Sequence, residues 1–339
     1  MTEVDPESLT IREYQPGDEH AILATFNRVF REVDPDFVDR TLEEWRWTYL
    51  DNPSGWRISL ALTPAGEVVS QYAGIAQRMR LDGEPAYFSQ AVDSMTDPAW
   101  RKGLKRPGFF VLTGYPYAAQ YGGPPPDKDV VMWGAPVPAA WRIGKSYLEY
   151  ELVRSQLKLT VEPDALRDRS VEGIDAAPVD AFGDDVEALF ERAAEGRRAI
   201  AVRDLAQLHW RFRDHPKHDY TLVEARRGGE LLGLAVYRLG TFDGRWNEAL
   251  IADWLVPATE RAAAHALRAW VRERALADGA ERVTAIFPDT APEWLAFQLA
   301  GFRAEPSRFF LVGRQYTRKY DMRWLYRNWY YTLGDTDLV

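Results

Sequence analysis

Residues 97–110, DPAWRKGLKRPGFF, hold four cations and two glycines within a chain whose formal net charge is −9. The first N–H groups of a helix have no partner inside the helix, and the helix dipole attracts negative charge there. A basic, glycine-containing loop in front of a helix could therefore bind a diphosphate, because glycine allows close approach and cations donate charge-assisted hydrogen bonds. An ordinary solvated surface loop is the alternative.

Asp93 precedes this loop, in the segment AVDSMTDP at 91–98. A carboxylate beside a reacting amine can act as a general base, and burial adjusts its affinity for the proton. The alternative is a structural aspartate near the end of a strand, satisfied by backbone donors.

A third candidate is DHPKHD at 214–219, which places two histidines beside two aspartates. Histidine and carboxylate are both zinc ligands, so the segment could hold a metal. A metal site is favoured over a turn only if a similar segment elsewhere in the chain has the same ligands.

The chain contains an internal repeat, since residues 42–69 align without a gap with residues 205–232. Trp47 then meets Trp210, and Asp93 and Asp253 occupy like places further along. The counterpart of DHPKHD is DNPSGW, which has no metal ligands, so we predict a turn and no metal site. The repeat predicts two domains, 1–163 and 164–316, followed by an aromatic-rich carboxyl-terminal tail at 317–339 that docks as a helix.

Each copy shows the same order of elements. A short strand (9–14 and 169–174) leads to helices and then to a hairpin (57–81 and 220–240). A central strand, a helix, a strand, a second helix and a final strand (151–159 and 307–314) follow. This order predicts the α/β (α+β) class, with two mixed sheets and helices on both faces.

The composition excludes several classes of protein. The chain has 339 residues, of which 46% are hydrophobic and none is cysteine, so disulfides and thiolate chemistry are excluded. A pI near 5.3 argues against binding to nucleic acid. Without an apolar run of about 18 residues, and with the polar start MTEVDPESLT, we expect a cytoplasmic protein without membrane association. A homo-oligomer is left open.

The sequence resembles the GCN5-related N-acetyltransferase (GNAT) superfamily across roughly residues 8–315. The segment IREYQPGDEHAILATFNRVF is typical of its first strand and helix, and TDPAWRKGLKRPGFF is similar to its central strand and acetyl-CoA loop. WGAPVPAAWRIG and TAPEWLAFQLAGF resemble its late strand-to-helix segment. The tandem arrangement is distantly similar to that of Eis-type acetyltransferases, so the resemblance implies two tandem GNAT-like domains.

The resemblance implies that acetyl-CoA, as the acyl-donor substrate, binds in the first copy. Lys105 takes the place of the motif's first cation and Gly108 that of its glycine, while Arg101 and Gly103 give an alternative register. The second copy has ATERAAAHALRAW instead, without glycine, and is expected to be degenerate. The residues expected at the cofactor are Met95, Thr96, Arg101, Gly103, Lys105, Arg106, Gly108, Phe109 and Phe110.

The chemistry that the resemblance implies also needs an acid for the thiolate leaving group, commonly a Tyr in the late helix. Phe297 occupies that place in the second copy and Gly144 or Lys145 in the first, so Tyr147, one turn further on, is the candidate. Asp93 is the candidate base. The expected function is acyl transfer from acetyl-CoA to the amine of a small molecule. Two alternatives are a catalytically inactive protein that binds CoA or another ligand, and an aminoacyl transferase of the Fem type.

Overall fold

The computed structural model describes residues 8–101, 107–242 and 247–338. By its internal contacts the chain forms two compact units. The first unit comprises residues 1–78, 85–153 and 311–322, and the second comprises 79–84, 154–310 and 323–339. The proposed repeat copies, 1–163 and 164–316, therefore remain a prediction about the sequence, because each contact unit draws on both stretches.

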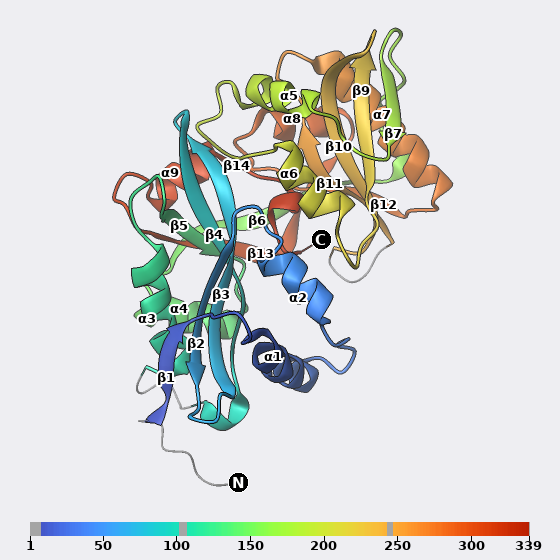
Figure 1. The fold of residues 1–339 in the computed structure, drawn as a ribbon. Helices are drawn as coiled ribbons and strands as arrows, with labels where there is room; N and C mark the ends of the chain where they lie inside the picture. The colour runs from blue at the N-terminus through green and yellow to red at the C-terminus, as the bar shows by residue number, and fades with distance from the viewer. Residues whose placement is uncertain (1–7, 102–106, 243–246, 339) are drawn as a thin grey trace. The chain divides into compact units, whose positions relative to one another are not determined.

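The first unit is a mixed sheet with helices on both faces (Figure 1). Its strands lie in the order β1-β2-β3-β4-β5-β13; β1, β2 and β3 are antiparallel, whereas β4 and β5 are parallel. The elements that begin in this unit are β1 (Thr10–Glu13), α1 (Glu19–Val33), α2 (Leu42–Tyr49), β2 (Trp56–Leu62), β3 (Val68–Leu81), β4 (Glu84–Thr96), α3 (Phe109–Tyr121), β5 (Asp129–Gly134), α4 (Pro138–Tyr147) and β6 (Glu151–Val161).

Alternation along β2 explains why both faces are covered. Ile58, Leu60 and Leu62 point into a core that α1 and α2 close, and Ala61 points to the opposite face, where Phe109 of α3 packs. Helix α2 begins at a capping box, in which Thr41 and Glu44 exchange hydrogen bonds between side chain and backbone. The predicted arrangement of the first copy is confirmed.

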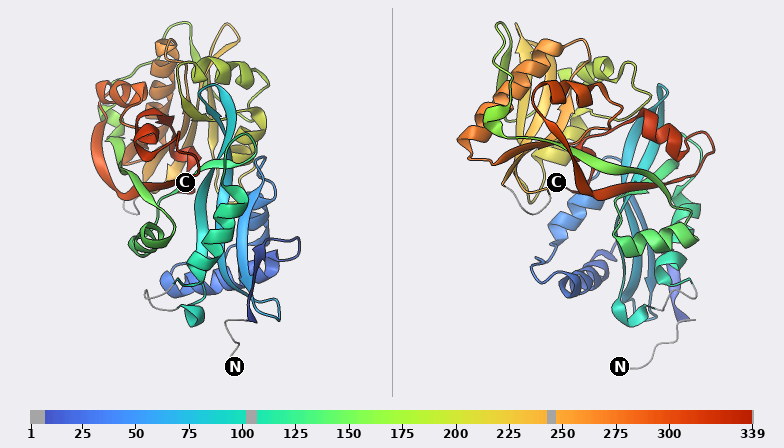
Figure 2. Two further views of the ribbon diagram at one scale, coloured as in Figure 1. Left: turned by 90° about the vertical axis from the view of Figure 1, so that its left-hand side faces the viewer. Right: turned by 180° about the vertical axis from the view of Figure 1, so that it is seen from behind.

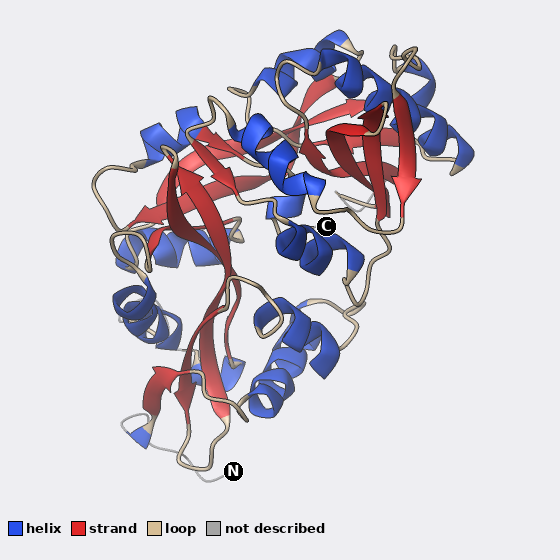
Figure 3. Ribbon diagram, turned by 45° about the horizontal axis from the view of Figure 1, so that its top comes forward, coloured by secondary structure: helices blue, strands red, loops and turns tan. Residues whose placement is uncertain are grey.

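The second unit repeats this order of strands, β7-β9-β10-β11-β12-β6, with β11 and β12 parallel. Figure 3 shows its strands between helices, with α7 packed on β7, β9 and β10 and α5 packed on β10 and β11. Its further elements are β7 (Asp175–Val179), α5 (Asp185–Ala194), β8 (Ala199–Ala201), α6 (Leu205–Leu208), a π-helical turn (His209–Arg213), β9 (Thr221–Arg227), β10 (Glu230–Gly240), β11 (Glu248–Leu255), α7 (Arg261–Ala277), β12 (Arg282–Ala285), α8 (Pro292–Leu299), β13 (Arg303–Gln315), α9 (Met322–Asn328) and β14 (Trp329–Tyr330).

The strand expected at 169–174 is wrong, because the first strand of this copy is β7, which begins at Asp175. A turn around Gly173, whose φ is 77°, precedes it. β7 contains Pro178; within the described ranges it pairs only with β9 and lies at the sheet edge, where proline is tolerated.

The final strands are exchanged between the two copies of the repeat. β6, the last strand of the first copy, pairs antiparallel with β12 of the second unit through Leu159 to Val161. β13, the last strand of the second copy, pairs antiparallel with β5 of the first unit through Val312 to Gln315. β13 also neighbours β6 in the strand order, and Figure 2 shows the two running side by side in red and green. The sequence predicted both strands but not this exchange of partners.

Residues 323–339 of the carboxyl-terminal tail belong to the second unit by their contacts. β14 pairs in parallel with β8, and Tyr330, Tyr331 and Leu333 are buried. The Tyr330 hydroxyl donates to the carbonyl of Trp254 at 2.8 Å. Across the part of the chain that the structure describes, no helix combines the length and the apolar character needed to span a bilayer.

Candidate active site and the recurring Arg–Asp pair

The parallel pairing of β4 with β5 ends before β4 does. It extends from Tyr87, opposite Asp129, to Gln90, opposite Trp133, whereas β4 continues to Thr96. β5 ends at Gly134, where a Cβ atom would lie 3.2 Å from the carbonyl oxygen of Ala91. Among the described residues, the part of β4 beyond Gln90 has no pairing with β5, so its backbone on that side is available to an extended ligand.

Met95 and Thr96 form the end of this unpaired part. Ser70 donates a hydrogen bond to the carbonyl of Met95, and its hydroxyl lies 2.8 Å from that of Thr96. The Nε of Arg101 donates to the carbonyl of Thr96 at 2.9 Å. These carbonyls already accept hydrogen bonds, so a ligand alongside would need the remaining backbone groups of the segment.

Helix α3 begins directly after the basic loop. Gly108 is its N-cap residue, and the first turn carries no acidic side chain. Phe109 packs edge-on against Trp100 with ring centroids 5.8 Å apart, and Phe110 packs against Tyr72 at 5.4 Å. The two phenylalanines therefore anchor the first turn, whose N–H groups remain available for an anion.

Three of the expected cofactor residues, Gly103, Lys105 and Arg106, lie outside the described residues. The register of the loop against a diphosphate therefore stays a prediction. Tyr147 is the last residue of α4 and is partly exposed.

Asp93 has a defined place in the first unit. Its φ of 52° is left-handed, a conformation that aspartate adopts more readily than bulky residues. Its carboxylate forms an ion pair with Arg40, and the Tyr49 hydroxyl donates to its Oδ2 at 2.7 Å. Burial raises the pKa of Tyr49 well above its ordinary value, and the negative charge of Asp93 raises it further, so Tyr49 stays a donor.

The second unit contains the same pair. In the repeat alignment Arg40 corresponds to Arg203, and Arg203 binds Asp253, the counterpart of Asp93, with Nη2 and Oδ1 3.1 Å apart. Where Tyr49 completes the first pair, the tail completes the second: Asp335 Oδ2 lies 2.6 Å from Arg203 Nη2, and the Thr332 hydroxyl donates to Asp253 at 2.8 Å. The repeat indicates that this ion pair holds the segment before α2 or α6 against the central strand.

Sequence reasoning missed this pair, although the signal was present. Arg40 and Arg203 each lie two residues before the start of the aligned stretches 42–69 and 205–232. A cation and a carboxylate that recur together at both copies predict a contact.

The histidine-rich segment 214–219 is a turn, as predicted. The Nδ1 of His215 accepts the backbone N–H groups of Lys217 and His218, each at 3.1 Å. A nitrogen used in this way is not offered to a metal. Within the described ranges, no group of three or more metal-binding side chains is positioned around a common point.

His215 should make stability depend on pH. Burial, helped by the charge of Arg211, lowers its pKa from 6.5 to about 2. Below pH 6.5 the unfolded chain therefore binds a proton that the folded chain does not, and stability falls. His215→Asn keeps a hydrogen-bond acceptor at this position. Between about pH 7.5 and about pH 5.5 its free energy of unfolding, measured with urea, should fall by about 1 kcal/mol less than that of the wild type. Equal losses in the two proteins would contradict this assignment.

Comparisons with known proteins identify the fold. No protein-family model matches the sequence, and no curated protein matches it. The chain is similar in structure to a probable N-acyltransferase from Enterococcus faecalis V583, at 13% identity and a TM-score of 0.65 over 94% of this chain and 74% of that chain. A GCN5-related N-acetyltransferase from Anabaena variabilis ATCC 29413 gives 12% identity and a TM-score of 0.67 over 91% and 73%.

Eis1 from Mycobacterium abscessus is a third similar structure, with 16% identity and a TM-score of 0.57 over 91% of this chain and 73% of that chain. At these identities the likeness concerns the fold. The chain has the mixed α/β fold of the GCN5-related N-acetyltransferases, and the fold expected from the sequence is confirmed.

Proposed function

We propose that this protein is an acyl-CoA-dependent N-acyltransferase that transfers an acetyl group to the amine of a small molecule by direct attack. The observation that carries the proposal is the end of the β4–β5 pairing at Gln90, followed by a basic loop and a helix without acidic residues in its first turn. The fold shared with N-acetyltransferases supports it.

The CoA diphosphate would bind at the start of α3, where the backbone of Gly108, Phe109 and Phe110 provides N–H donors. Arg101, with Gly103, Lys105 and Arg106 of the loop, would add positive charge and close backbone approach. The pantetheine arm would run along the unpaired part of β4, beside Met95 and Thr96. This placement directs the thioester toward Asp93.

In the proposed reaction the amine nitrogen attacks the thioester carbonyl carbon, and the C–S bond breaks when the tetrahedral intermediate collapses. Asp93 would accept the proton of the amine through Oδ1, which has no hydrogen-bond partner among the described residues. Tyr147 would donate its proton to the departing thiolate.

Asp93→Asn is expected to lower kcat about 100-fold while the Kd for acetyl-CoA stays within about twofold, because the proton acceptor is lost and the CoA contacts are not. Kcat is measured from thiol release and Kd by calorimetry. The internal repeat provides the control, since Asp253→Asn removes the same partner of an arginine in the second unit.

The two variants separate catalysis from structure. If Asp93 acts only with Arg40 to hold the fold, both variants should lose stability and activity in parallel. Loss of kcat confined to Asp93→Asn at temperatures where both variants are folded supports the base. Parallel losses overturn it.

A second candidate function follows from the recurring pair itself. Because Arg203 and Asp253 repeat the arrangement of Arg40 and Asp93, the arrangement can serve the fold alone. The protein would then bind CoA without turning it over.

The test of function titrates the full chain with acetyl-CoA and with CoA, and then follows thiol release with a panel of small amines. Binding with amine-dependent release supports the transferase. Binding without release for any amine favours the second candidate. Failure to bind either nucleotide overturns both.

A further inference from the structure

The second unit contains a pocket at the place where the first unit has its basic loop. It is lined by residues of the segment 167–171, by the end of β11 and the loop that follows it, by the first turns of α7 and by one face of α8. Its volume is about 880 Å³, within the range of small-molecule sites. A degenerate copy with a purely structural role would not need such a pocket.

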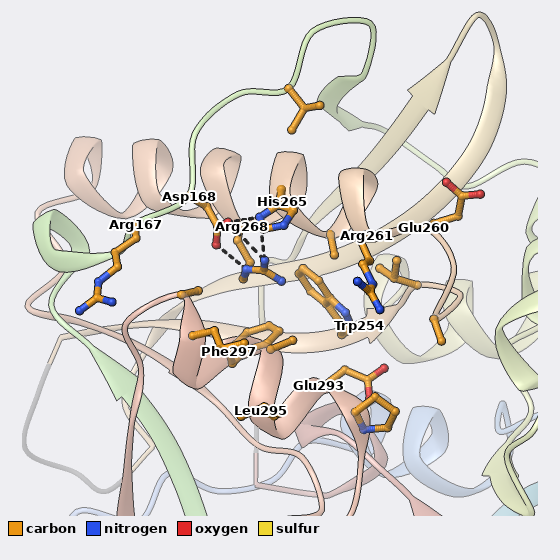
Figure 4. A pocket seen from close by; sticks show the side chains of 18 of the residues that line it. Arg167, Asp168, Trp254, Glu260, Arg261, His265, Arg268, Glu293, Leu295 and Phe297 are labelled. Atoms are coloured by element: carbon orange, nitrogen blue, oxygen red, sulfur yellow. Dashed lines mark hydrogen bonds and ion pairs between the residues drawn. The ribbon is translucent and has the colours of Figure 1, made fainter.

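One wall of the pocket is apolar. Leu295 and Leu299, one turn apart on α8, are 62% and 70% exposed although they line a concavity. Trp254 and Phe297 are buried beneath them and pack edge to face, with ring centroids 5.1 Å apart. Figure 4 shows Leu295 and Phe297 of α8 and Trp254 of β11 around the same space. Exposed leucines in a hollow indicate an apolar ligand.

The lining of the pocket also carries positive charge. Arg167, Arg169 and Arg261 line the pocket, are exposed, and have no side-chain partner among the described residues. Arg268 differs, because it is buried and bound to Asp168, which also contacts His265 (Figure 4). The unpaired arginines therefore remain for a ligand.

The charged residues of the pocket favour a ligand with a single negative charge. Glu260 lines the pocket immediately before α7, where negative charge opposes a diphosphate. Together with the three unpaired arginines it leaves a modest positive field. A singly charged group such as a carboxylate matches this field better than a diphosphate does.

Glu293 adds a hydrogen-bond requirement. This pocket residue is only 8% exposed, and its Oε1 accepts from Arg197 at 2.5 Å. Its Oε2 is buried without any hydrogen-bond partner. A buried acceptor without a partner is costly, so a ligand N–H or O–H that reaches Oε2 would satisfy it.

We propose that this pocket binds an amphipathic carboxylate that carries an N–H or O–H donor near its head, the pattern of an N-acyl amino acid or a hydroxy fatty acid. The carboxylate binds Arg261, which Figure 4 shows on the same side of the pocket as Glu293, the chain lies on Leu295 and Leu299, and the donor bonds to Glu293. This site does not depend on the CoA site proposed for the first unit.

The experiment is calorimetry of the full chain with N-decanoylglycine, 3-hydroxydecanoate, decanoate and octanoyl-CoA. The first two should bind, and decanoate, which lacks the donor, should bind about tenfold more weakly. The better of the first two identifies the source of the donor. The proposal is overturned if decanoate binds as tightly as the donor-bearing probes, or if neither donor-bearing probe binds. It is also overturned if octanoyl-CoA binds to this pocket and to no other site of the protein.

Variants locate the binding. Leu295→Glu and Arg261→Gln, both at exposed positions, should each weaken N-decanoylglycine about tenfold. Leu276→Glu, at a 46% exposed leucine of α7 outside the pocket, is the matched control and should bind as the wild type does. Unchanged affinity in both pocket variants overturns the proposal.

Two further variants complete the design. Glu293→Gln should remove the preference for donor-bearing probes over decanoate, a ratio that a general loss of structure would not change selectively. Gly108→Glu, in the first unit, should leave N-decanoylglycine binding unchanged. Failure of the CoA site and failure of this pocket can thus be told apart, and loss of N-decanoylglycine binding in Gly108→Glu overturns the separate site.

Discussion

Gly108→Glu is expected to weaken acetyl-CoA binding about 1000-fold, equivalent to about 4 kcal/mol, as measured by calorimetry. A carboxylate at the N-cap of α3 would lie where the proposed diphosphate sits, and apposed like charges cost several kcal/mol. The fold should tolerate the change, since Gly108 has an ordinary φ of −87° and nothing lies within 4 Å of a Cβ placed there.

Gly108→Gln is the matched control, because glutamine has nearly the same shape as glutamate without its charge. It should bind acetyl-CoA within about fivefold of the wild type. Two results would count against the assignment of the helix start: equal weakening by both variants, which would indicate a steric effect, and no weakening by glutamate.

Arg203→Met should destabilise the protein by about 3–5 kcal/mol, because it leaves the buried carboxylates of Asp253 and Asp335 without their cation. The side chain of Arg203 is 4% exposed, so water cannot replace the lost contacts. Urea unfolding measures the change. Arg274→Met is the control; it breaks a half-exposed pair with Asp278 and should cost no more than about 0.5 kcal/mol.

The loss in Arg203→Met should shrink in acid. Burial raises the pKa of Asp335 above its ordinary 3.8, and Arg203 is the largest opposing influence, so the variant should raise this pKa further. A carboxyl group whose pKa is raised by folding binds protons more tightly when folded, so stability rises as the pH falls toward 3.8. A deficit that stays constant as the pH falls from neutrality to 3.8 would contradict this account.

Local signals in the sequence predicted most elements. Alternation and glycine turns indicated the hairpins that became β2–β3 and β9–β10. Of the two tryptophans that the copies share, Trp210 is buried and Trp47 is partly buried. These features depend on neighbours in the sequence and on the gain from burying apolar surface.

Features that depend on long-range contacts were not predictable in this way. The partner of a final strand is set by which sheet edge is open, and the periodicity of β6 and β13 is the same for either partner. At the site, spacing indicated Asp93 but not its contacts with Arg40 and Tyr49, which come from distant segments. The pocket of the second unit was missed because α7 begins without a glycine motif, and only the fold brings Glu293 and Leu295 to it.

The exchanged strands constrain how the protein is made. On the ribosome β5 emerges long before residues 312–315 of β13. The edge of β5 that pairs with β13 therefore stays unpaired while the whole second copy is synthesised. Such an open edge is a template for pairing with other chains, which makes the nascent protein dependent on rapid completion or on chaperones. A fragment that ends at residue 163 would keep that open edge permanently, and translation pauses within the second copy should increase aggregation more than pauses within the first.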